Sequence, residues 1–192
     1  ISDAAFSPKA FQYAINQAKC AAKEPNDITN PANPFEKNLV RVYALYQQEM
    51  FARNAIDFGE IITLTYRVLK NNPELLKKYQ EQFQFIHVDE YQDTNHAQYL
   101  LINILAQGHK NLCVVGDEDQ SIYRWRGADI RNILEFERDY PEARVVKLEQ
   151  NYRSTQTIIN ASSHVIANNT SRLAKTLWTD NPRGDRIQKV AL

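Results

Sequence analysis

The stretch that decides the fold is residues 83–94, which read FQFIHVDEYQDT. Its first half is a short apolar run that ends at Val88, and two carboxylates, Asp89 and Glu90, follow directly. Short apolar runs with a helical pattern after them are typical of buried strands in parallel sheets. The segment therefore predicts a strand whose carboxyl end carries acidic side chains.

Two later runs repeat this arrangement. Residues 112–115 read LCVV and residues 145–148 read VVKL, and polar residues follow each run. Helical patterns come after the three runs, at residues 97–106, 130–140 and 155–168. Strands that alternate with helices predict an α/β fold with a parallel sheet, in which ligands bind beyond the carboxyl ends of the strands. All three polar clusters fall at that edge.

The chain before these runs, residues 7–80, has a mainly helical pattern. Ser7 followed by Pro8 is a typical helix start. Residues 24–34 hold three prolines and several Asn and Asp residues, which predicts a surface loop. Apolar stripes at helical spacing occupy most of the remainder, and we interpret them as core packing rather than as a binding site.

Composition sets a few limits. The 192 residues include 23 basic and 23 acidic side chains, so a nucleic-acid surface would have to be a local feature. Cys20 and Cys113 lack metal-ligand or redox spacing, and Cys113 lies in an apolar run, which predicts a buried, reduced thiol and a cytoplasmic protein. There is no run of membrane-spanning length and no signal peptide. Because the chain starts at Ile1 and holds one methionine, we expect a segment of a longer polypeptide.

The acidic pair has a chemical interpretation. Of two adjacent carboxylates, one can hold Mg²⁺ while the other orients or deprotonates a water, which is what metal-assisted phosphate hydrolysis requires. A bare Asp-Glu pair is also typical of a solvated turn. The longer string DEYQDT at residues 89–94 favours the chemical interpretation.

The other two clusters add binding chemistry. Gln120 can hydrogen-bond a phosphate oxygen or a water. Tyr123 and Trp125 alternate with arginines, a mixture that binds single-stranded DNA by stacking at roughly 1–3 kcal/mol per base; a core aromatic flanked by surface arginines is the alternative. In the third cluster Ser154 is a candidate N-cap. Ahead of it, Tyr152 and Arg153 are suited to a base and to phosphate charge.

Taken in order, three strings resemble motifs II, III and IV of the UvrD/Rep/PcrA type of superfamily 1 DNA helicases. They are DEYQDT at 89–94, GDEDQSIYRWRGAD at 116–129 and LEQNYRST at 148–155. The resemblance is very specific from residue 85 to residue 154 and continues more weakly on both sides, so it covers most of the chain.

The resemblance implies a role for each candidate residue. Asp89 would ligate Mg²⁺ and Glu90 would position the attacking water, while Gln120 would sense the γ-phosphate of ATP. The remaining roles are divided between nucleotide and DNA: Tyr152 would pack on adenine, Arg153 would be the arginine finger, and Tyr123, Trp125 and Arg126 would contact single-stranded DNA.

The resemblance also implies the architecture, a RecA-like P-loop NTPase motor core with a helical insertion subdomain. Residues 1–55 would end the helical insertion, residues 56–145 would complete the first motor domain, and residues 146–192 would open the second. Where relatives carry a second acidic residue after Asp57-Phe58, this chain has Gly59, and we expect the change to affect only the local helix start.

One family feature is missing from the sequence. None of the five glycines is followed by lysine, so there is no G-x-x-x-x-G-K-[ST] phosphate loop.

Taken as a whole, the resemblance predicts an ATP-dependent helicase that moves 3′ to 5′ on single-stranded DNA and at duplex junctions. ATP turnover would need the rest of the polypeptide, and repair or replication proteins would be its partners.

Other functions remain open at this point. A helicase-nuclease of the RecB/AddA type shares the same motifs. A DNA-binding module without catalysis would keep only the aromatic and arginine residues. A stand-alone Mg²⁺ phosphohydrolase would require Asp89, Asp93, Asp117 and Asp119 to converge on one metal.

Overall fold

The computed structural model describes residues 6–169 and 175–190. The chain divides into two compact units, which are described separately below. The first comprises Ile1–Asp117 and Ser121–Ile133, and the second comprises Glu118–Gln120 and Leu134–Leu192.

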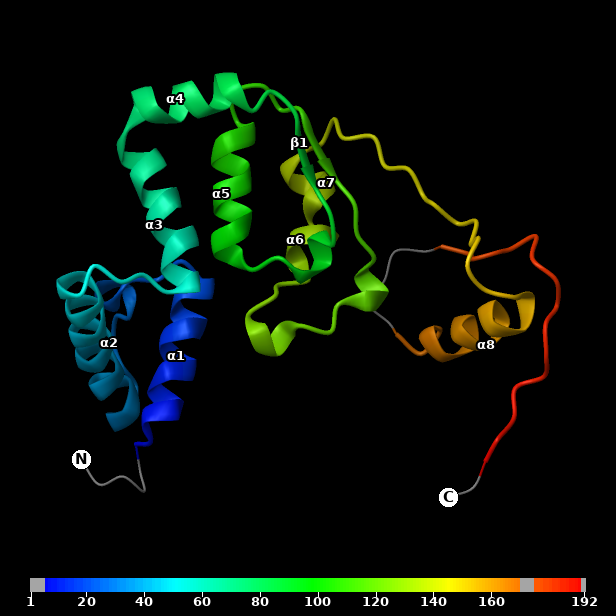
Figure 1. Ribbon diagram of the computed structural model, residues 1–192, viewed down its shortest axis with the longest axis horizontal. Coiled ribbons are helices and arrows are strands. Elements are labelled where there is room, and N and C mark those ends of the chain that lie inside the picture. The colour runs from blue at the N-terminus through cyan, green and yellow to red at the C-terminus, as the bar shows by residue number, and fades with distance from the viewer. Residues whose placement is uncertain (1–5, 170–174, 191–192) are drawn as a thin grey trace. The chain divides into compact units, whose positions relative to one another are not determined.

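The first unit is mainly helical, with a small sheet (Figure 1). Its long helices are α1 (Pro8–Cys20), α2 (Pro34–Ala52), α3 (Phe58–Asn71), α4 (Pro73–Gln82) and α5 (His96–Ala106). Its strands are β1 (Ile86–Val88) and β2 (Leu112–Val114), and its short 3-10 turns are η1 (Pro25–Asp27), η2 (Tyr91–Asp93) and η4 (Arg124–Arg126).

Polar caps fix where these helices begin. The Ser7 hydroxyl accepts a hydrogen bond from the backbone N–H of Ala10 ahead of Pro8, so the predicted start of the first helix is confirmed. Asn33 and Asp57 cap α2 and α3 in the same way. Such a cap contributes about 1 kcal/mol, because it satisfies an N–H that lacks a partner within the helix.

Aromatic packing between α1 and α2 forms the buried core of the first unit. Phe11, Ile15, Leu39 and Tyr43 are buried there. The rings of Phe11 and Phe35 stack with their centroids 4.8 Å apart. The interpretation of the apolar stripes as core packing is confirmed for Leu39 and Leu69, which are buried, but Leu45 and Leu64 of the same stripes are exposed.

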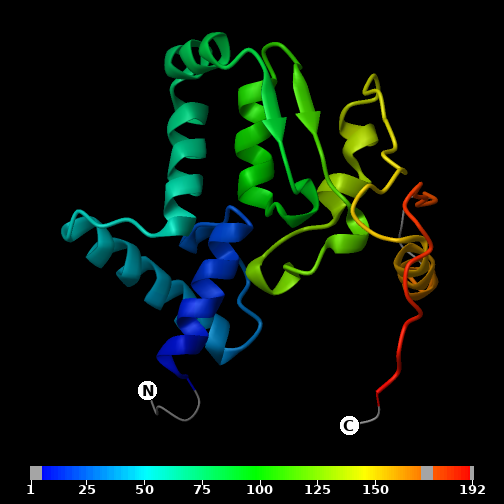
Figure 2. The same ribbon diagram turned by 45° about the vertical axis from the view of Figure 1, so that its right-hand side comes forward.

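The two strands pair in parallel, with Ile86 opposite Leu112 and His87 opposite Cys113. Helix α5 connects them and lies beside them (Figures 1 and 2), so the predicted β-α-β unit is confirmed. Cys113 is exposed, which contradicts the predicted buried thiol. It shares an exposed sheet face with His87, whereas Ile86 and Leu112 are half-buried on the other face.

The second unit differs from the prediction. Residues 145–148 form no strand within the described ranges, and Val145, Val146 and Leu148 are exposed. An apolar run needs a neighbouring strand to pair with, and this segment has only an isolated parallel bridge between Gln150 and Trp178. The third predicted strand is therefore wrong for this structure.

The expected helix at residues 130–140 is also interrupted. It forms two short helices, α6 (Arg131–Leu134), which crosses the boundary between the units, and α7 (Phe136–Asp139). The second unit also contains η3 (Glu118–Gln120) and α8 (Gln156–Ile166). Among the described residues, no helix combines the length and apolar character needed to cross a membrane.

Candidate functional site

The end of β1 carries the predicted acidic pair on a tight turn. Asp89 and Glu90 are both exposed, and Glu90 has a left-handed backbone conformation with φ of 50°. That conformation costs a non-glycine residue about 1–2 kcal/mol, so surrounding contacts must hold it. They do: the N–H of Tyr91 donates to the carbonyl of Val115 at 3.0 Å, joining the turn to the end of β2.

The carboxylate of Asp89 suits a divalent cation. Its Oδ1 atom accepts the N–H of Glu90 at 2.9 Å, which orients the group and leaves Oδ2 for another ligand. Mg²⁺ is usually bound by one or two carboxylates together with water and substrate phosphates. The residues present at this turn therefore fit a magnesium ion.

A buried polar layer supports the acidic turn from below. Gln92 donates from Nε2 to Oε2 of Glu90 at 2.7 Å, and its Oε1 accepts the N–H of Asp117 at 2.9 Å. The hydroxyl of Thr94 donates to the carbonyl of Tyr91 at 2.7 Å. Sequence reasoning did not single out Gln92 or Thr94, although their polar side chains inside a strand-end motif were the available signal.

Asp93 lies between Gln92 and Thr94 in the sequence. Burial, together with the negative charge of Glu90, raises the pKa of its carboxyl group. Within the described residues, neither Asp89 nor Asp93 belongs to a group of three acidic, histidine or cysteine side chains whose ligand atoms lie within 4.8 Å of one another. The arrangement therefore gives no support to a stand-alone phosphohydrolase with four converging aspartates.

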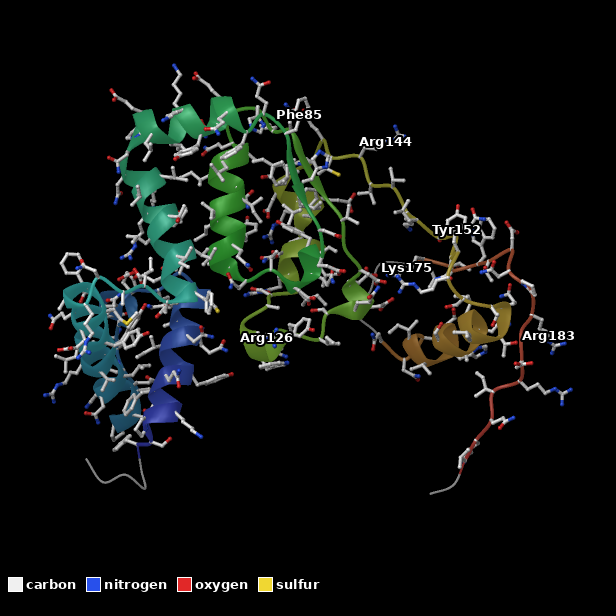
Figure 3. All side chains as sticks on the ribbon, viewed as in Figure 1. Phe85, Arg126, Arg144, Tyr152, Lys175 and Arg183 are labelled. Carbon is white, nitrogen blue, oxygen red and sulfur yellow. The ribbon has the colours of Figure 1, made fainter. Side chains whose placement is uncertain are left out.

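The predicted aromatic and arginine residues lie on one loop, residues 123–127, which we call the aromatic–arginine loop. Figure 3 labels Arg126 on it. The guanidinium of Arg126 lies 4.9 Å from the ring centroid of Tyr123 and 4.7 Å from that of Trp125. Trp125 is 61% exposed. An exposed indole ring with a cation over it can stack on a base while the arginine meets a phosphate.

Helix α1 holds this loop from behind. The side chain of Gln17 donates from Nε2 to the carbonyl of Trp125 at 3.0 Å, and the thiol of Cys20 contacts the carbonyl of Arg126 at 3.4 Å. Gly127 has φ of 93°, and a Cβ there would lie 2.8 Å from the Cys20 sulfur. Sequence reasoning missed both α1 residues, because more than 100 positions separate them from the loop.

A cleft of about 1050 Å³ lies between α1 and the same loop, within the first unit. Basic side chains from three segments line it, namely Lys23, Arg124 and Arg131. Arg131 hydrogen-bonds Asp129 and thereby lowers the pKa of that carboxyl group. The chain thus has a local basic surface even though its net charge is zero.

The second unit holds the other three predicted residues. Tyr152 is 78% exposed, and its hydroxyl donates to Oε1 of Gln150 at 2.7 Å. Arg153 is exposed, and its N–H donates to Oδ1 of Asn151 at 3.0 Å. Gln120 is exposed at the end of η3. The two side-chain contacts are short in sequence, whereas the backbone around the tyrosine–arginine pair is also bonded to residues 178 and 181.

The start of α8 differs from the prediction. Its N-cap residue is Thr155, without a side-chain capping bond, so the assignment of Ser154 as N-cap is wrong. Asn151 takes the hydrogen-bonding role instead, because its Oδ1 accepts the N–H of Ser154 at 2.8 Å. Asn181 donates to the carbonyls of Tyr152 and Ser154, which closes the segment.

Comparison with known proteins now identifies the class. Residues 1–141 match the UvrD/REP helicase N-terminal domain, and residues 146–191 match the UvrD-like helicase C-terminal domain. The chain therefore belongs to the UvrD-like helicase family.

Individual relatives narrow the resemblance. The chain is 53% identical over 184 residues to the ATP-dependent DNA helicase PcrA of Staphylococcus epidermidis, and 52% identical over 183 residues to that of Staphylococcus aureus. Each match covers 95% of this chain but 25% of the relative. The chain thus spans about a quarter of the length of the curated relatives it matches.

Proposed function

We propose that this chain is the part of an ATP-dependent DNA helicase that links the metal and water residues of ATP hydrolysis to a grip on single-stranded DNA. One observation carries the proposal: the acidic turn and the aromatic–arginine loop are hydrogen-bonded through a shared backbone segment. The N–H of Asp129 donates to the carbonyl of Thr94 at 2.9 Å, and Asn95 forms an antiparallel bridge with Ala128.

This connection gives a physical route for coupling. Thr94 directly follows the turn that carries Glu90, and Asp129 lies two residues after the aromatic–arginine loop. A shift of the acidic turn would therefore pull on the strand-like segment that ends the DNA loop. Coupling of this kind requires an element that both sites can bias, and the 94–95 and 128–129 pairing is such an element.

At the acidic turn, Asp89 would bind Mg²⁺, which when bound neutralises charge on the transferred phosphate. Glu90 would orient the attacking water and accept its proton, because its carboxylate is exposed and held by one donor, Gln92. The direction of the Glu90 side chain follows from the left-handed backbone of that residue. Both roles agree with the carboxylate and water ligands by which proteins usually bind Mg²⁺.

The residues of the second unit would complete the nucleotide site. Tyr152 would pack on adenine and Arg153 would act as the arginine finger, roles supported by the exposure of both side chains. Gln120 would sense the γ-phosphate. An arginine finger typically contributes about 10³–10⁵ in rate.

On the DNA side, Tyr123, Trp125 and Arg126 would bind single-stranded DNA, supported by their gathering on one exposed loop beside a basic cleft. Movement would run 3′ to 5′ and end in unwinding at duplex junctions. Repair or replication proteins would be partners, as the family resemblance implies.

The architecture would be RecA-like, with residues 1–55 ending a helical insertion, 56–145 completing the first motor domain and 146–192 opening the second. The parallel β1-α5-β2 unit with acidic residues at the strand end supports this. The change of family match between residues 141 and 146 also supports it. Since the sequence lacks a phosphate loop, residues 1–192 alone would not turn over ATP.

The test is DNA-stimulated ATP hydrolysis by the longer polypeptide that contains this chain, compared with its Arg153→Ala variant. We expect a loss of about 10³-fold or more in kcat. Arg138→Ala is the matched control, because Arg138 is an exposed arginine of the same unit that pairs with Glu135. A longer polypeptide that binds single-stranded DNA without hydrolysing ATP would instead indicate a binding module.

A further inference from the structure

We infer that Gln92 is a positioning residue for ATP hydrolysis, which holds the Glu90 carboxylate in place and ties it to the backbone at the end of β2. The inference rests on the proposed role of Glu90 as the water-orienting carboxylate. It adds a residue that contacts neither ATP nor DNA in that proposal, and that acts only through Glu90.

The geometry is a relay through one side chain. Gln92 is 1% exposed, and both ends of its amide are used. Nε2 donates to Oε2 of Glu90 at 2.7 Å, and Oε1 accepts the N–H of Asp117 at 2.9 Å. The backbone carbonyl of Gln92 also accepts the hydroxyl of Ser121 at 3.4 Å. The residue is therefore fixed at its main chain and at both amide atoms.

The chemistry requires glutamine at this position. The Glu90 carboxylate needs a donor, whereas the Asp117 N–H needs an acceptor, and an amide supplies both from one planar group. A leucine would fill the space but remove both the donor to Glu90 and the acceptor for the Asp117 N–H. A glutamate would keep the acceptor for Asp117 but place a second carboxyl group where Glu90 needs a donor.

Holding Glu90 matters because the turn does not constrain its side chain otherwise. Among the described residues, Gln92 is the one hydrogen-bond donor from another residue to the side-chain carboxylate of Glu90, which is exposed. A carboxylate that must meet one water in one orientation loses rate when it samples other rotamers. A hydrogen bond to a charged group, at 2.7 Å, is strong enough to select one orientation.

The two hydrogen bonds of the Gln92 amide also couple the Glu90 carboxylate to the backbone at Asp117. Asp117 lies three residues before Gln120, the proposed γ-phosphate sensor, along the same segment. A displacement of the backbone at Asp117 would move the Gln92 amide and, through it, the Glu90 carboxylate. Gln92 thus makes the water-orienting group responsive to the segment that follows β2.

The experiment compares kcat and KM for DNA-stimulated ATP hydrolysis by the longer polypeptide. Gln92→Glu keeps the shape and the acceptor, and Gln92→Leu removes both bonds. Both variants should lower kcat by about 10-fold to 100-fold, as expected for losing a hydrogen bond to a charged group. The KM for ATP and the affinity for single-stranded DNA should change less than about twofold, because Gln92 would act in the chemical step.

A merely structural role would give a different pattern. Gln80→Leu is the matched control, since Gln80 is a half-buried glutamine of the same unit whose Nε2 donates to the Ile104 carbonyl at 2.8 Å rather than to Glu90. If Gln80→Leu and Gln92→Leu lower kcat equally at equal loss of thermal stability, the inference is overturned. Normal kcat in Gln92→Leu overturns it as well.

A double-mutant cycle separates the inference from the function on which it rests. In a Glu90→Gln background, Gln92→Leu should cause no further loss in single-turnover rate, because Gln92 acts through the carboxylate that is gone. A further loss of tenfold would overturn the inference. If Glu90→Gln itself retains kcat, the proposed role of Glu90 fails instead.

Discussion

In each of the two units a lysine lies between two carboxylates, but the distances from its nitrogen to the carboxylate oxygens differ. In the first unit, Lys19 is 2% exposed and lies 2.7 Å from Asp57 and 3.0 Å from Glu60. In the second, Lys175 lies 3.3 Å from Glu118 and 3.5 Å from its neighbouring aspartate, and its side chain is 17% exposed. The first cluster has the shorter contacts and the more buried lysine, whereas the carboxylates of the second cluster are the more buried, 5% and 8% exposed against 27% and 17%.

The same contrast extends to the candidate site residues. In the first unit, buried Gln92 and Thr94 hold the acidic turn, and Gln17 holds the aromatic–arginine loop from another helix. In the second, the side chains of Tyr152 and Arg153 are exposed, and the segment that carries them is held at its backbone by Asn181. The first unit therefore carries a preorganised site within itself, whereas the second presents side chains ready to meet a ligand.

The largest expected effect comes from removing the buried lysines. Lys19→Met should lower the free energy of unfolding by about 3 kcal/mol, because it leaves Asp57 without a cation and takes one of two cations from Glu60, which keeps Arg67. Lys175→Met should cost less, about 1–2 kcal/mol, because its nitrogen–oxygen distances of 3.3 and 3.5 Å are longer than those of Lys19. Urea unfolding of each variant measures the difference.

An exposed ion pair serves as the control for the two lysine variants. Arg53→Met removes the exposed pair with Glu49 on α2 and should cost no more than about 0.5 kcal/mol. Equal losses for Lys19→Met and Lys175→Met would abolish the distinction between the two clusters.

The next effect concerns two glycines with left-handed backbones. Gly127→Ala should destabilise the first unit by about 2–4 kcal/mol, combining the backbone cost with a clash against buried Cys20. Gly184→Ala, with φ of 74° and a clash against half-buried Thr155, should cost about 1–2 kcal/mol, since Thr155 is less buried than Cys20 and lies at the start of α8. Thermal unfolding measures both.

A second substitution, Cys20→Ala, tests the origin of the larger loss of stability, that of Gly127→Ala. Adding Cys20→Ala to Gly127→Ala should recover part of the stability, because it removes the sulfur at 2.8 Å. No recovery would mean that the loss comes from the backbone conformation of Gly127 and from the contact with the Cys20 Cβ at 2.7 Å, which alanine keeps.

Sequence patterns predicted one region far better than the other, for physical reasons. The run ending at Val88 and the run at 112–115 became paired strands, because α5 between them brings both edges together. The run at 145–148 has equal β propensity but no partner strand within the described residues, and pairing rather than propensity makes a strand. Propensity alone cannot supply that partner.

The candidate site shows the same limit. Asp89 and Glu90 were identifiable because adjacent carboxylates at a strand end form a local pattern. The support from Gln17 was not identifiable, since its bond to Trp125 spans 108 positions. Local chemistry is visible in spacing, whereas contacts between distant segments depend on the fold.

A smaller effect concerns pH. Burial, then the bond to Asp57 and nearby acidic charge, raise the pKa of Tyr46 to about 12, above its unfolded value of about 10. The stability that this neutral hydroxyl contributes is therefore complete below pH 10 and is lost as the pH rises from about 10 to about 12. Tyr46→Phe should lower stability by about 1 kcal/mol at pH 8 and flatten the loss above pH 10.

The control for this pH profile is Tyr13→Phe, which changes an exposed tyrosine on α1. That variant should keep the steep alkaline loss measured for the parent protein by urea titration at several pH values. A profile for Tyr46→Phe that stays as steep as the parent's would assign the alkaline loss to other groups.

The smallest expected effect tests whether the first unit holds its DNA loop from α1. Gln17→Ala removes the donor to the Trp125 carbonyl, a partly exposed neutral hydrogen bond worth about 0.5–1.5 kcal/mol. Single-stranded DNA affinity of the longer polypeptide should therefore fall about twofold to tenfold, measured by fluorescence anisotropy of a labelled oligonucleotide. Gln12→Ala, an exposed glutamine on the same helix, should leave affinity unchanged. Equal affinity in both variants would mean that the loop keeps its conformation without the Gln17 hydrogen bond, and that the Cys20 contact and the bridge at Ala128 are sufficient to present the indole ring.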